Sequence, residues 1–324
     1  MKKEDKYSIT SNIPKLLKHL DNLKSLQKGI PKPILLHLMP TNQCNLKCEN
    51  CCFAEANSKE VQNLDIDLAK DILTQFIALG TRAVEITGFG DPTAYPHINE
   101  LIDYAYSLGF SIGMNTNGHF AKNIINWQNF KWVRLSMNTL DFYSIKSAYP
   151  MDYIRQAAPN LQISGCYVWT SKGKKTIKKI IEFANKEKIP IRVVPNCIDT
   201  AKGIEKQIKL IKKLIPKDDP YVFCSDFNIT TRKRKNYDCY LHLIKPALAP
   251  NGWIYSCPSS ELSKENGTIL KNEFRICKGK DVFSFYTSPA AFKIPIHNCS
   301  YCKYTEFNEL LYNLLMKTGG NEFT

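Results

Sequence analysis

Hydrophobic residues follow two different periods along the first two thirds of the chain. In several stretches, apolar side chains recur every three or four positions, which is typical of amphipathic helices. Between them lie short apolar runs with the length of buried strands. The runs predict strands at 34–39, 82–87, 110–115, 131–138, 161–168 and 189–196, and the periodic stretches predict helices at 64–79, 95–108, 172–187 and 202–214.

This alternation predicts the fold class. Six strands, most of them followed by helices, favour parallel βαβ units in an α/β protein. Six such units would form an incomplete, TIM-like barrel, a partial (β/α)6 barrel. Its functional groups are expected on the loops that follow the carboxyl ends of the strands.

The pattern changes on both sides of this region. Residues 13–27 predict one packing helix, with Pro14 in its first turn. Near residue 220, cysteines, prolines and short strand-like pieces replace the long helices, and a terminal amphipathic helix is predicted at 306–317. We therefore predict a helical extension over 1–33, a partial barrel over 34–215 and a small α+β domain over 216–324.

Composition limits where such a chain functions. Of 324 residues, 44% are hydrophobic and 23% charged, which is ordinary for a soluble globular protein. The sequence has no apolar run of membrane-spanning length and no secretory signal at its start. Twelve cysteines without an export signal favour metal ligation or reactive thiols over disulfides. We therefore expect the protein to function in a reducing cytoplasm.

The formal net charge of +14 is concentrated partly in basic runs, at 171–188 and 231–235. Such runs are either solvated helix faces or a surface that attracts an acidic peptide, a nucleotide or a nucleic acid. No nucleic-acid motif accompanies the charge, so the charge alone does not choose among these partners.

The stretch "CNLKCENCC" begins at Cys44 and follows the first predicted strand. Cys44, Cys48 and Cys51 have the spacing C-x3-C-x2-C, whereas Cys52 adjoins Cys51 and points away from it. A [4Fe-4S] cluster held by three cysteines keeps one iron open for another ligand. Structural zinc prefers four closed ligands, so zinc and redox thiols are the weaker alternatives.

A C-x3-C-x2-C loop after the first strand of a six-unit βα chain resembles the radical S-adenosylmethionine (radical SAM) superfamily. The resemblance covers about residues 34–215. It implies a partial (β/α)6 barrel and a [4Fe-4S] cluster whose open iron chelates the amino and carboxylate groups of SAM. It also implies reductive cleavage of SAM to a 5′-deoxyadenosyl radical, which removes a hydrogen atom from a substrate C–H bond.

The same resemblance implies which residues contact SAM. "TGFGDP" (87–92) takes the place of the family's Gly-Gly-Glu type motif, with Asp91 for the usual Glu, and "NTNG" (115–118) follows the third strand as in many members. Asn50 occupies the position where the family favours an aromatic residue, and Phe53 is expected to pack on adenine instead. The implied SAM contacts are Gly88, Phe89, Gly90, Asp91, Asn115, Ser136 and Phe53.

A second set of cysteines lies beyond the expected barrel. Cys239, Gly252 and Cys257 have the spacing C-x12-G-x4-C, and Cys299 and Cys302 form a C-x2-C pair. By themselves, two separated pairs would indicate structural zinc. Beside the first motif, they resemble the twitch domain, the short version of the SPASM extension. This implies an auxiliary [4Fe-4S] cluster that accepts an electron from the substrate radical.

Five cysteines remain outside both sets, and each of them is a candidate for an ordinary buried hydrophobe. Three of them lie near the expected active-site face or the domain junction. A thiol there could return a hydrogen atom to the substrate, which would give epimerisation. These candidate hydrogen donors are Cys166, Cys197 and Cys224.

The sequence therefore predicts a radical SAM oxidoreductase that oxidises or cross-links a ribosomally made peptide. The alternatives are an epimerase with a cysteine donor, a dehydrogenase of a small alcohol, sugar or nucleotide, and a non-catalytic metal-binding scaffold. The expected partners are a substrate peptide or small molecule and an electron donor such as flavodoxin or ferredoxin. An acidic substrate would suit the positive net charge of the protein. No membrane partner is expected.

Overall fold

The computed structural model describes residues 13–51, 53, 60–196, 199–225, 238–258, 272–293, 302 and 304–316. Their strands are β1 (Leu35–Leu38), β2 (Ala83–Ile86), β3 (Ser111–Thr116), β4 (Phe130–Ser136), β5 (Gln162–Val168), β6 (Ile191–Val194), β7 (Val222–Cys224), β8 (Ala247–Leu248), β9 (Trp253–Tyr255) and β10 (Arg275–Lys278). The α-helices are α2 (Leu20–Gln27), α4 (Ile66–Ala78), α5 (Ile98–Ser107), α6 (Ile145–Ala148), α7 (Met151–Ala157), α8 (Gly173–Glu187), α9 (Ala201–Leu214), α10 (Val282–Tyr286) and α11 (Thr305–Met316). The 3-10 helices are η1 (Ile13–His19), η2 (Pro92–Ala94), η3 (Ala121–Asn123), η4 (Trp127–Asn129), η5 (Met137–Asp141), η6 (Leu241–Leu243), η9 (Asn272–Phe274), η10 (Gly279–Asp281) and η11 (Pro289–Phe292).

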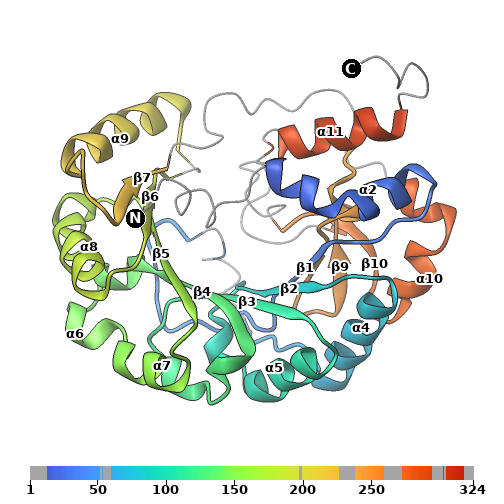
Figure 1. The fold of residues 1–324 in the computed structure, drawn as a ribbon, viewed down its shortest axis with the longest axis horizontal. Coiled ribbons are helices and arrows are strands. Elements are labelled where there is room, and N and C mark those ends of the chain that lie inside the picture. The colour runs from blue at the N-terminus through green and yellow to red at the C-terminus, as the bar shows by residue number, and fades with distance from the viewer. Residues whose placement is uncertain are drawn as a thin grey trace.

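The described strands form one sheet in the order β10-β9-β8-β1-β2-β3-β4-β5-β6-β7. Neighbouring strands from β1 to β7 are parallel, and β8 adds to β1 in the same direction. Only β9 and β10 join by antiparallel pairing. Figure 1 shows the sheet as an arc with α4 to α9 along its outer side and with α2 and α11 on its open side. The carboxyl ends of β1 to β7 therefore meet along one rim.

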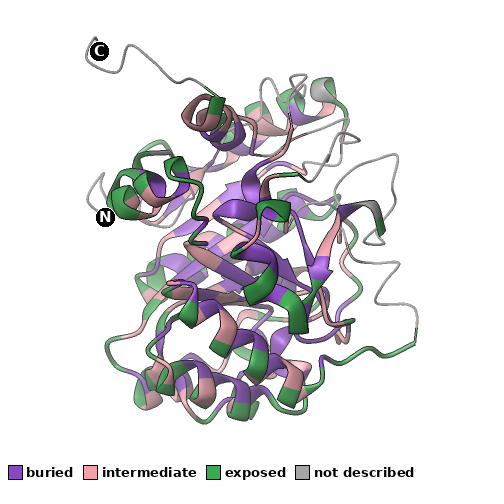
Figure 2. Ribbon diagram, turned by 90° about the vertical axis from the view of Figure 1, so that its right-hand side faces the viewer, coloured by how far each residue is buried: buried purple, intermediate pink, exposed green. Residues whose placement is uncertain are grey.

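Hydrophobic burial explains why the helices cover the outer face. Successive strand residues point to opposite faces of a sheet. In β4, Val133 and Leu135 lie in the same hydrophobic core as Phe76 of α4, whereas Arg134 between them is only partly buried. Figure 2 shows the buried residues concentrated on the sheet and on the inward sides of the helices. The outer face is thus apolar, and the inner face carries polar residues.

The structure confirms the six predicted strands and the predicted α/β class. The helix predicted at 13–27 is 3-10 over η1 and α-helical over α2. In the region of the βα units, the strand β7 and the helices α6 and α7 were not predicted, because three residues are a minimal strand and four or seven residues are too few to show a helical period. The short elements β8, β10 and α10 were not predicted either. The division of the chain at residue 215 stays a prediction. Within the described ranges, none of the helices combines the length and the apolar composition needed to span a bilayer.

Candidate active site

The three closely spaced cysteines lie on the loop that follows β1, at the carboxyl rim of the sheet. Cys44, Cys48 and Cys51 are all partly buried and none is in a disulfide. Two nitrogen atoms donate to the sulfur of Cys44: the backbone N–H of Leu46 at 3.4 Å and Nδ2 of Asn117 at 3.8 Å. Such N–H donors favour the charged form of a sulfur ligand.

Burial raises the pKa of all three thiols. It is the largest cause that raises the pKa of Cys44 to about 11 and that of Cys48 to about 12. Burial also raises the pKa of Cys51. Cys51 and Cys44 add to the shift at Cys48, because three thiolates this close repel one another.

A bound cation would stabilise the three sulfurs as thiolates, and the irons of an iron–sulfur cluster would supply that positive charge. The donor set therefore fits a [4Fe-4S] cluster with three cysteine ligands. In the described part of the chain, no three His, Cys, Asp or Glu side chains are already arranged around a metal-ion position.

The segment after β2 fixes the beginning of the cysteine loop by backbone contact. The N–H of Gly90 donates to the carbonyl of Thr41 at 2.8 Å, and the N–H of Asp91 donates to that of Gln43 at 2.7 Å. A Cβ atom at Gly90 would stand 1.9 Å from the carbonyl oxygen of Gln43. Glycine at position 90 therefore permits the close approach, directly before Cys44.

Asp91 connects this segment to the end of β3. Its buried carboxylate accepts hydrogen bonds from the N–H and hydroxyl of Thr93, at 3.0 and 2.5 Å. It also accepts from the hydroxyl of Thr116 at 2.9 Å and from the N–H of Asn117 at 2.5 Å. Nδ2 of Asn117 in turn donates to the sulfur of Cys44 at 3.8 Å and to the side-chain oxygen of Asn45 at 2.8 Å. Asp91 thus orients a residue that contacts the cysteine loop, while its own SAM contact stays a prediction.

The far end of the cysteine loop is held by the segment after β5. Nδ2 of Asn50 donates to the carbonyl of Trp169 at 2.7 Å. The carboxylate of Glu49 accepts from the N–H of Ser171 at 3.1 Å and from its hydroxyl at 2.5 Å. The sequence analysis noted Asn50 only as a missing aromatic residue. Its contact lies 119 residues away along the chain, so no local pattern could have revealed it.

The other residues predicted to contact SAM lie around the same rim. The ring of Phe53 packs on that of Phe89, with centroids 4.7 Å apart. A Cβ atom at Gly88 would stand 1.7 Å from the carbonyl oxygen of Gly90, so this turn is also tight. The carbonyl of Ser136, at the end of β4, accepts a hydrogen bond from the hydroxyl of Tyr149 at 2.7 Å. Their contacts with SAM stay predictions.

Below the rim, neighbouring strands share a polar layer of which the sequence analysis named only Asn115, whose SAM contact stays a prediction, and Cys166. Nε2 of His37 lies 3.6 Å from Oε2 of Glu85, and Nδ2 of Asn115 donates to Oε1 of Glu85 at 2.6 Å. Nη1 of Arg134 donates to Oδ1 of Asn115 at 3.3 Å. The layer contains one residue from each of β1 to β6: His37, Glu85, Asn115, Arg134, Cys166 and Arg192. In β1, β2 and β6, a single polar residue inside an apolar strand was the signal that could have revealed it.

Glu85 is ionised within this layer although it is buried. Burial alone would raise the pKa of its carboxyl group. The charges of His37, Lys245 and Arg134, together with the hydrogen bond from Asn115, outweigh burial and lower this pKa to about 2. Glu85 is therefore a fixed negative charge at neutral pH.

We expect the substitution Glu85→Gln to lower the free energy of unfolding by about 3 kcal/mol at neutral pH, because it removes one partner of a buried charge pair. The folded-state pKa lies below the unfolded value of 4.5, so this stabilisation is complete above pH 4.5 and is lost as the pH falls toward 2. Urea unfolding at several pH values would measure the difference from the wild type. Glu100→Gln, at an exposed ion pair with Lys70, is the matched control and should change little.

The predicted second set of cysteines is described only in part. Cys239, Cys257 and Cys302 are partly buried and not in disulfides, whereas Cys299 lies outside the described residues. Of the candidate hydrogen donors, Cys197 also lies outside them, and Cys224 ends β7. Cys166 lies on β5 with its sulfur 3.2 Å from Nε of Arg192. The auxiliary site and the donors stay predictions.

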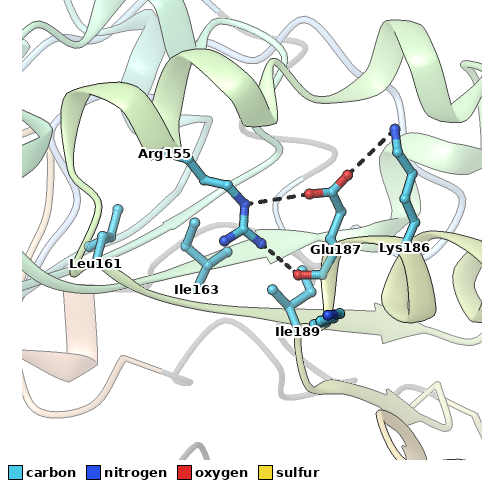
Figure 3. Close-up of a pocket in the computed structure, with 7 residues that line it drawn as sticks. Arg155, Leu161, Ile163, Lys186, Glu187 and Ile189 are labelled. Atoms are coloured by element: carbon cyan, nitrogen blue, oxygen red, sulfur yellow. Dashed lines mark hydrogen bonds and ion pairs between the residues drawn. The ribbon is translucent and has the colours of Figure 1, made fainter.

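A separate pocket of about 400 Å³ lies at the opposite end of the strands. Leu161 and Ile189, which line it, precede β5 and β6 (Figure 3). Of its charged side chains, Glu187 lies 3.5 Å from Arg155 and 3.6 Å from Lys186. This pocket is remote from the cysteine loop and is not the candidate site.

The family model of the radical SAM superfamily matches residues 38–144. Among curated proteins, the mycofactocin maturase MftC of Mycobacterium tuberculosis is 30% identical over 110 residues, which cover 34% of this chain and 26% of that protein. The tungsten-containing aldehyde ferredoxin oxidoreductase cofactor-modifying protein of Pyrococcus furiosus is 34% identical over 86 residues, 26% of this chain and 23% of that protein. The matched segments span about a quarter of the length of these relatives.

Among solved structures, SuiB of Streptococcus suis bound to S-adenosylmethionine is similar with a TM-score of 0.56 and 20% identity, over 87% of this chain and 73% of that one. SuiB bound to the precursor peptide SuiA is similar with a TM-score of 0.55, again with 20% identity, over 88% of this chain and 72% of that one. At this identity the likeness concerns the fold, a mixed α/β architecture with a mainly parallel sheet.

Proposed function

We propose, for a chain that carries a radical SAM domain over residues 38–144, that the protein cleaves S-adenosylmethionine reductively and oxidises or cross-links a ribosomally made peptide. One observation carries this proposal: the loop with Cys44, Cys48 and Cys51 is held at both ends at the carboxyl rim of a parallel sheet. When bound there, a [4Fe-4S] cluster and SAM supply a 5′-deoxyadenosyl radical, which removes a substrate hydrogen atom.

The chain's own residues then have distinct tasks. Gly90 and Asp91 hold the loop against the end of β2, and Asn50 holds it against the end of β5. Asn117 and Leu46 donate to the sulfur of Cys44, which stabilises the thiolate as a ligand. The rigid sheet beneath keeps these groups in register, as a reactive intermediate requires.

Two observations support a peptide as the substrate. The name of MftC describes a maturase, and SuiB has been solved with a precursor peptide. In addition, a net charge of +14 suits an acidic peptide segment. An electron donor such as flavodoxin or ferredoxin would reduce the cluster.

We also propose that Cys239, Cys257, Cys299 and Cys302 hold an auxiliary [4Fe-4S] cluster in a twitch-like domain over residues 216–324. Two separated pairs of cysteines support this proposal. Four cysteine ligands close a cluster, so it would accept an electron from the substrate radical rather than bind SAM. This is why oxidation or cross-linking is favoured over epimerisation.

Mass spectrometry of the product in ordinary and deuterated water tests the reaction, with precursor peptides encoded beside the gene as substrates. Oxidation or cross-linking makes the product two hydrogens lighter and brings no solvent deuterium to the reacting carbon. Epimerisation with a thiol donor such as Cys166 leaves the mass unchanged in water. In deuterated water it would add about one mass unit, because thiol hydrogens exchange with solvent. Single deuterium incorporation with inverted stereochemistry would overturn the oxidation proposal.

A further inference from the structure

Two guanidinium groups lie on the inner face of the sheet, on either side of β5. Arg134 of β4 pairs in register with Ser164 of β5, and Arg192 of β6 pairs with Cys166 of β5. Nε of Arg192 donates to the sulfur of Cys166 at 3.2 Å. Cys166 contributes to the pKa shifts of both arginines, so the three side chains form one group.

The guanidinium of Arg192 has more N–H donors than it uses on the described residues. A guanidinium has five N–H donors and no acceptor, and Arg192 uses one of them within the described residues, on Cys166. Arg192 is only partly buried, so it is not sealed in the hydrophobic core. The carboxylate of Glu85, on β2, is three strands of the sheet away from Cys166 and already bonds to Asn115. Its charge raises the pKa of Arg192, by less than Cys166 does.

Positive charge accumulates around this group. Burial, and then the charge of Arg134, lower the pKa of Lys15, and Arg192 contributes in the same direction. Lys15 lies on η1, which places a third cation at the inner face of the sheet. The carboxylate of Glu85 opposes this repulsion at all three cations. A further anion beside Arg192 and Arg134 would act in the same direction.

The depth of the group suits a substrate contact. Cys166 precedes Trp169 by three residues, about 10 Å of strand, and the carbonyl of Trp169 contacts the cysteine loop through Asn50. A substrate reaching from the cysteine loop toward Arg192 would cover that distance with about three extended residues of peptide. The positive charge favours an anionic group, and the distance from the cysteine loop is one that a bound peptide can span.

We infer that Arg192, with Arg134 beside it, binds a carboxylate of the substrate inside the barrel. This rests on the proposed peptide substrate and names the group that orients it. Arginine binds carboxylates through two parallel N–H···O bonds, which fixes orientation as well as position. The carboxylate belongs either to a Glu or Asp side chain or to the end of the peptide.

Equilibrium binding of three fluorescent nonapeptide pools to the cluster-loaded protein with SAM, without reductant, tests the inference. The first pool has Glu at the centre and an amidated end, the second has Gln and an amidated end, and the third has Gln and a free carboxylate. We expect the first or the third pool to bind roughly tenfold to a hundredfold more tightly than the second. Whichever of the two binds more tightly identifies the source of the carboxylate.

Variants separate the arginine's own contact from an indirect effect. Arg192→Gln should remove the preference, and Arg192→Lys should keep part of it because it keeps the charge. Arg155→Gln, the same change on the outer surface, should preserve it. Loss of the preference in Cys166→Ala would mean that Arg192 acts through that thiol and would overturn the inference. Equal binding of all three pools would do the same.

The binding measurement does not depend on SAM cleavage. Conversion of SAM by the reduced wild-type protein tests the proposed function, whereas the three pools test the carboxylate site. Iron content and thermal unfolding would show that Arg192→Gln is folded and loaded. If Arg192→Gln does not fold, Arg192→Lys decides the result: a preference as large as that of the wild type would overturn the inference.

Discussion

Replacing Cys51 with alanine is expected to reduce the conversion of SAM to 5′-deoxyadenosine and methionine to background. The residue is one of three thiols that the loop after β1 offers, and a cluster with two protein ligands would lose its fixed position. Chromatography of the anaerobically reconstituted, dithionite-reduced protein measures both products. In parallel, the iron content should be about eight atoms in the wild type and about four when Cys44, Cys48 and Cys51 are all replaced, four per cluster.

A matched control is available in Cys277→Ala. Cys277 is buried in the hydrophobic core and belongs to neither cysteine set. Its loss should lower stability by about 1 kcal/mol but preserve iron and SAM cleavage. Persistent cleavage in Cys51→Ala would show that the cluster loop has been misidentified. About four irons in the wild type, with stoichiometric zinc, would refute the auxiliary cluster and leave the radical chemistry intact.

The regular part of the fold could be predicted from sequence because its signal is local. Each strand from β1 to β6 is an apolar run, and α4, α5, α8 and α9 bury one stripe of residues. Parallel strands buried on the helix side carry this pattern directly in the chain. The three-residue strand β7 and the seven-residue helix α7 carry too little of it.

The cysteine loop could be predicted for the same reason, since three ligands within eight residues are adjacent in the chain. The residues that hold the loop in place could not be predicted from sequence. Asn50 and Trp169 are 119 residues apart, and Asn117 and Cys44 are 73 apart, so only the fold brings them together. Local propensity does not encode contacts of that range.

The polar layer illustrates a different limit. Glu85 and Arg192 each interrupt an otherwise apolar strand, and a single polar residue in a strand is compatible with either face of a sheet. Whether these residues form a site depends on the register between strands. The register of β5 and β6 sets Arg192 opposite Cys166.

Gly90→Ala is the second substitution with a large expected effect. The new Cβ would stand 1.9 Å from the carbonyl oxygen of Gln43 and 2.6 Å from the backbone carbon of Asn42, and neither atom belongs to a side chain that could turn away. The backbone must separate, which breaks the hydrogen bonds from Gly90 to Thr41 and from Asp91 to Gln43. Because Gln43 directly precedes Cys44, we expect loss of cluster iron and a fall in SAM cleavage of about a hundredfold, as a displacement near 1 Å can cause.

The control must separate a displaced cluster loop from general destabilisation. Gly109 has a φ of +84° and nothing within 4 Å of an added Cβ, so Gly109→Ala costs about 1 kcal/mol of backbone strain far from the cysteines. It should retain iron and cleavage at a lowered melting temperature. If Gly90→Ala lost only affinity for SAM and kept its iron, Gly90 would act as a SAM contact alone. If it retained both, the packing of the β2 segment on Gln43 would not be what positions Cys44.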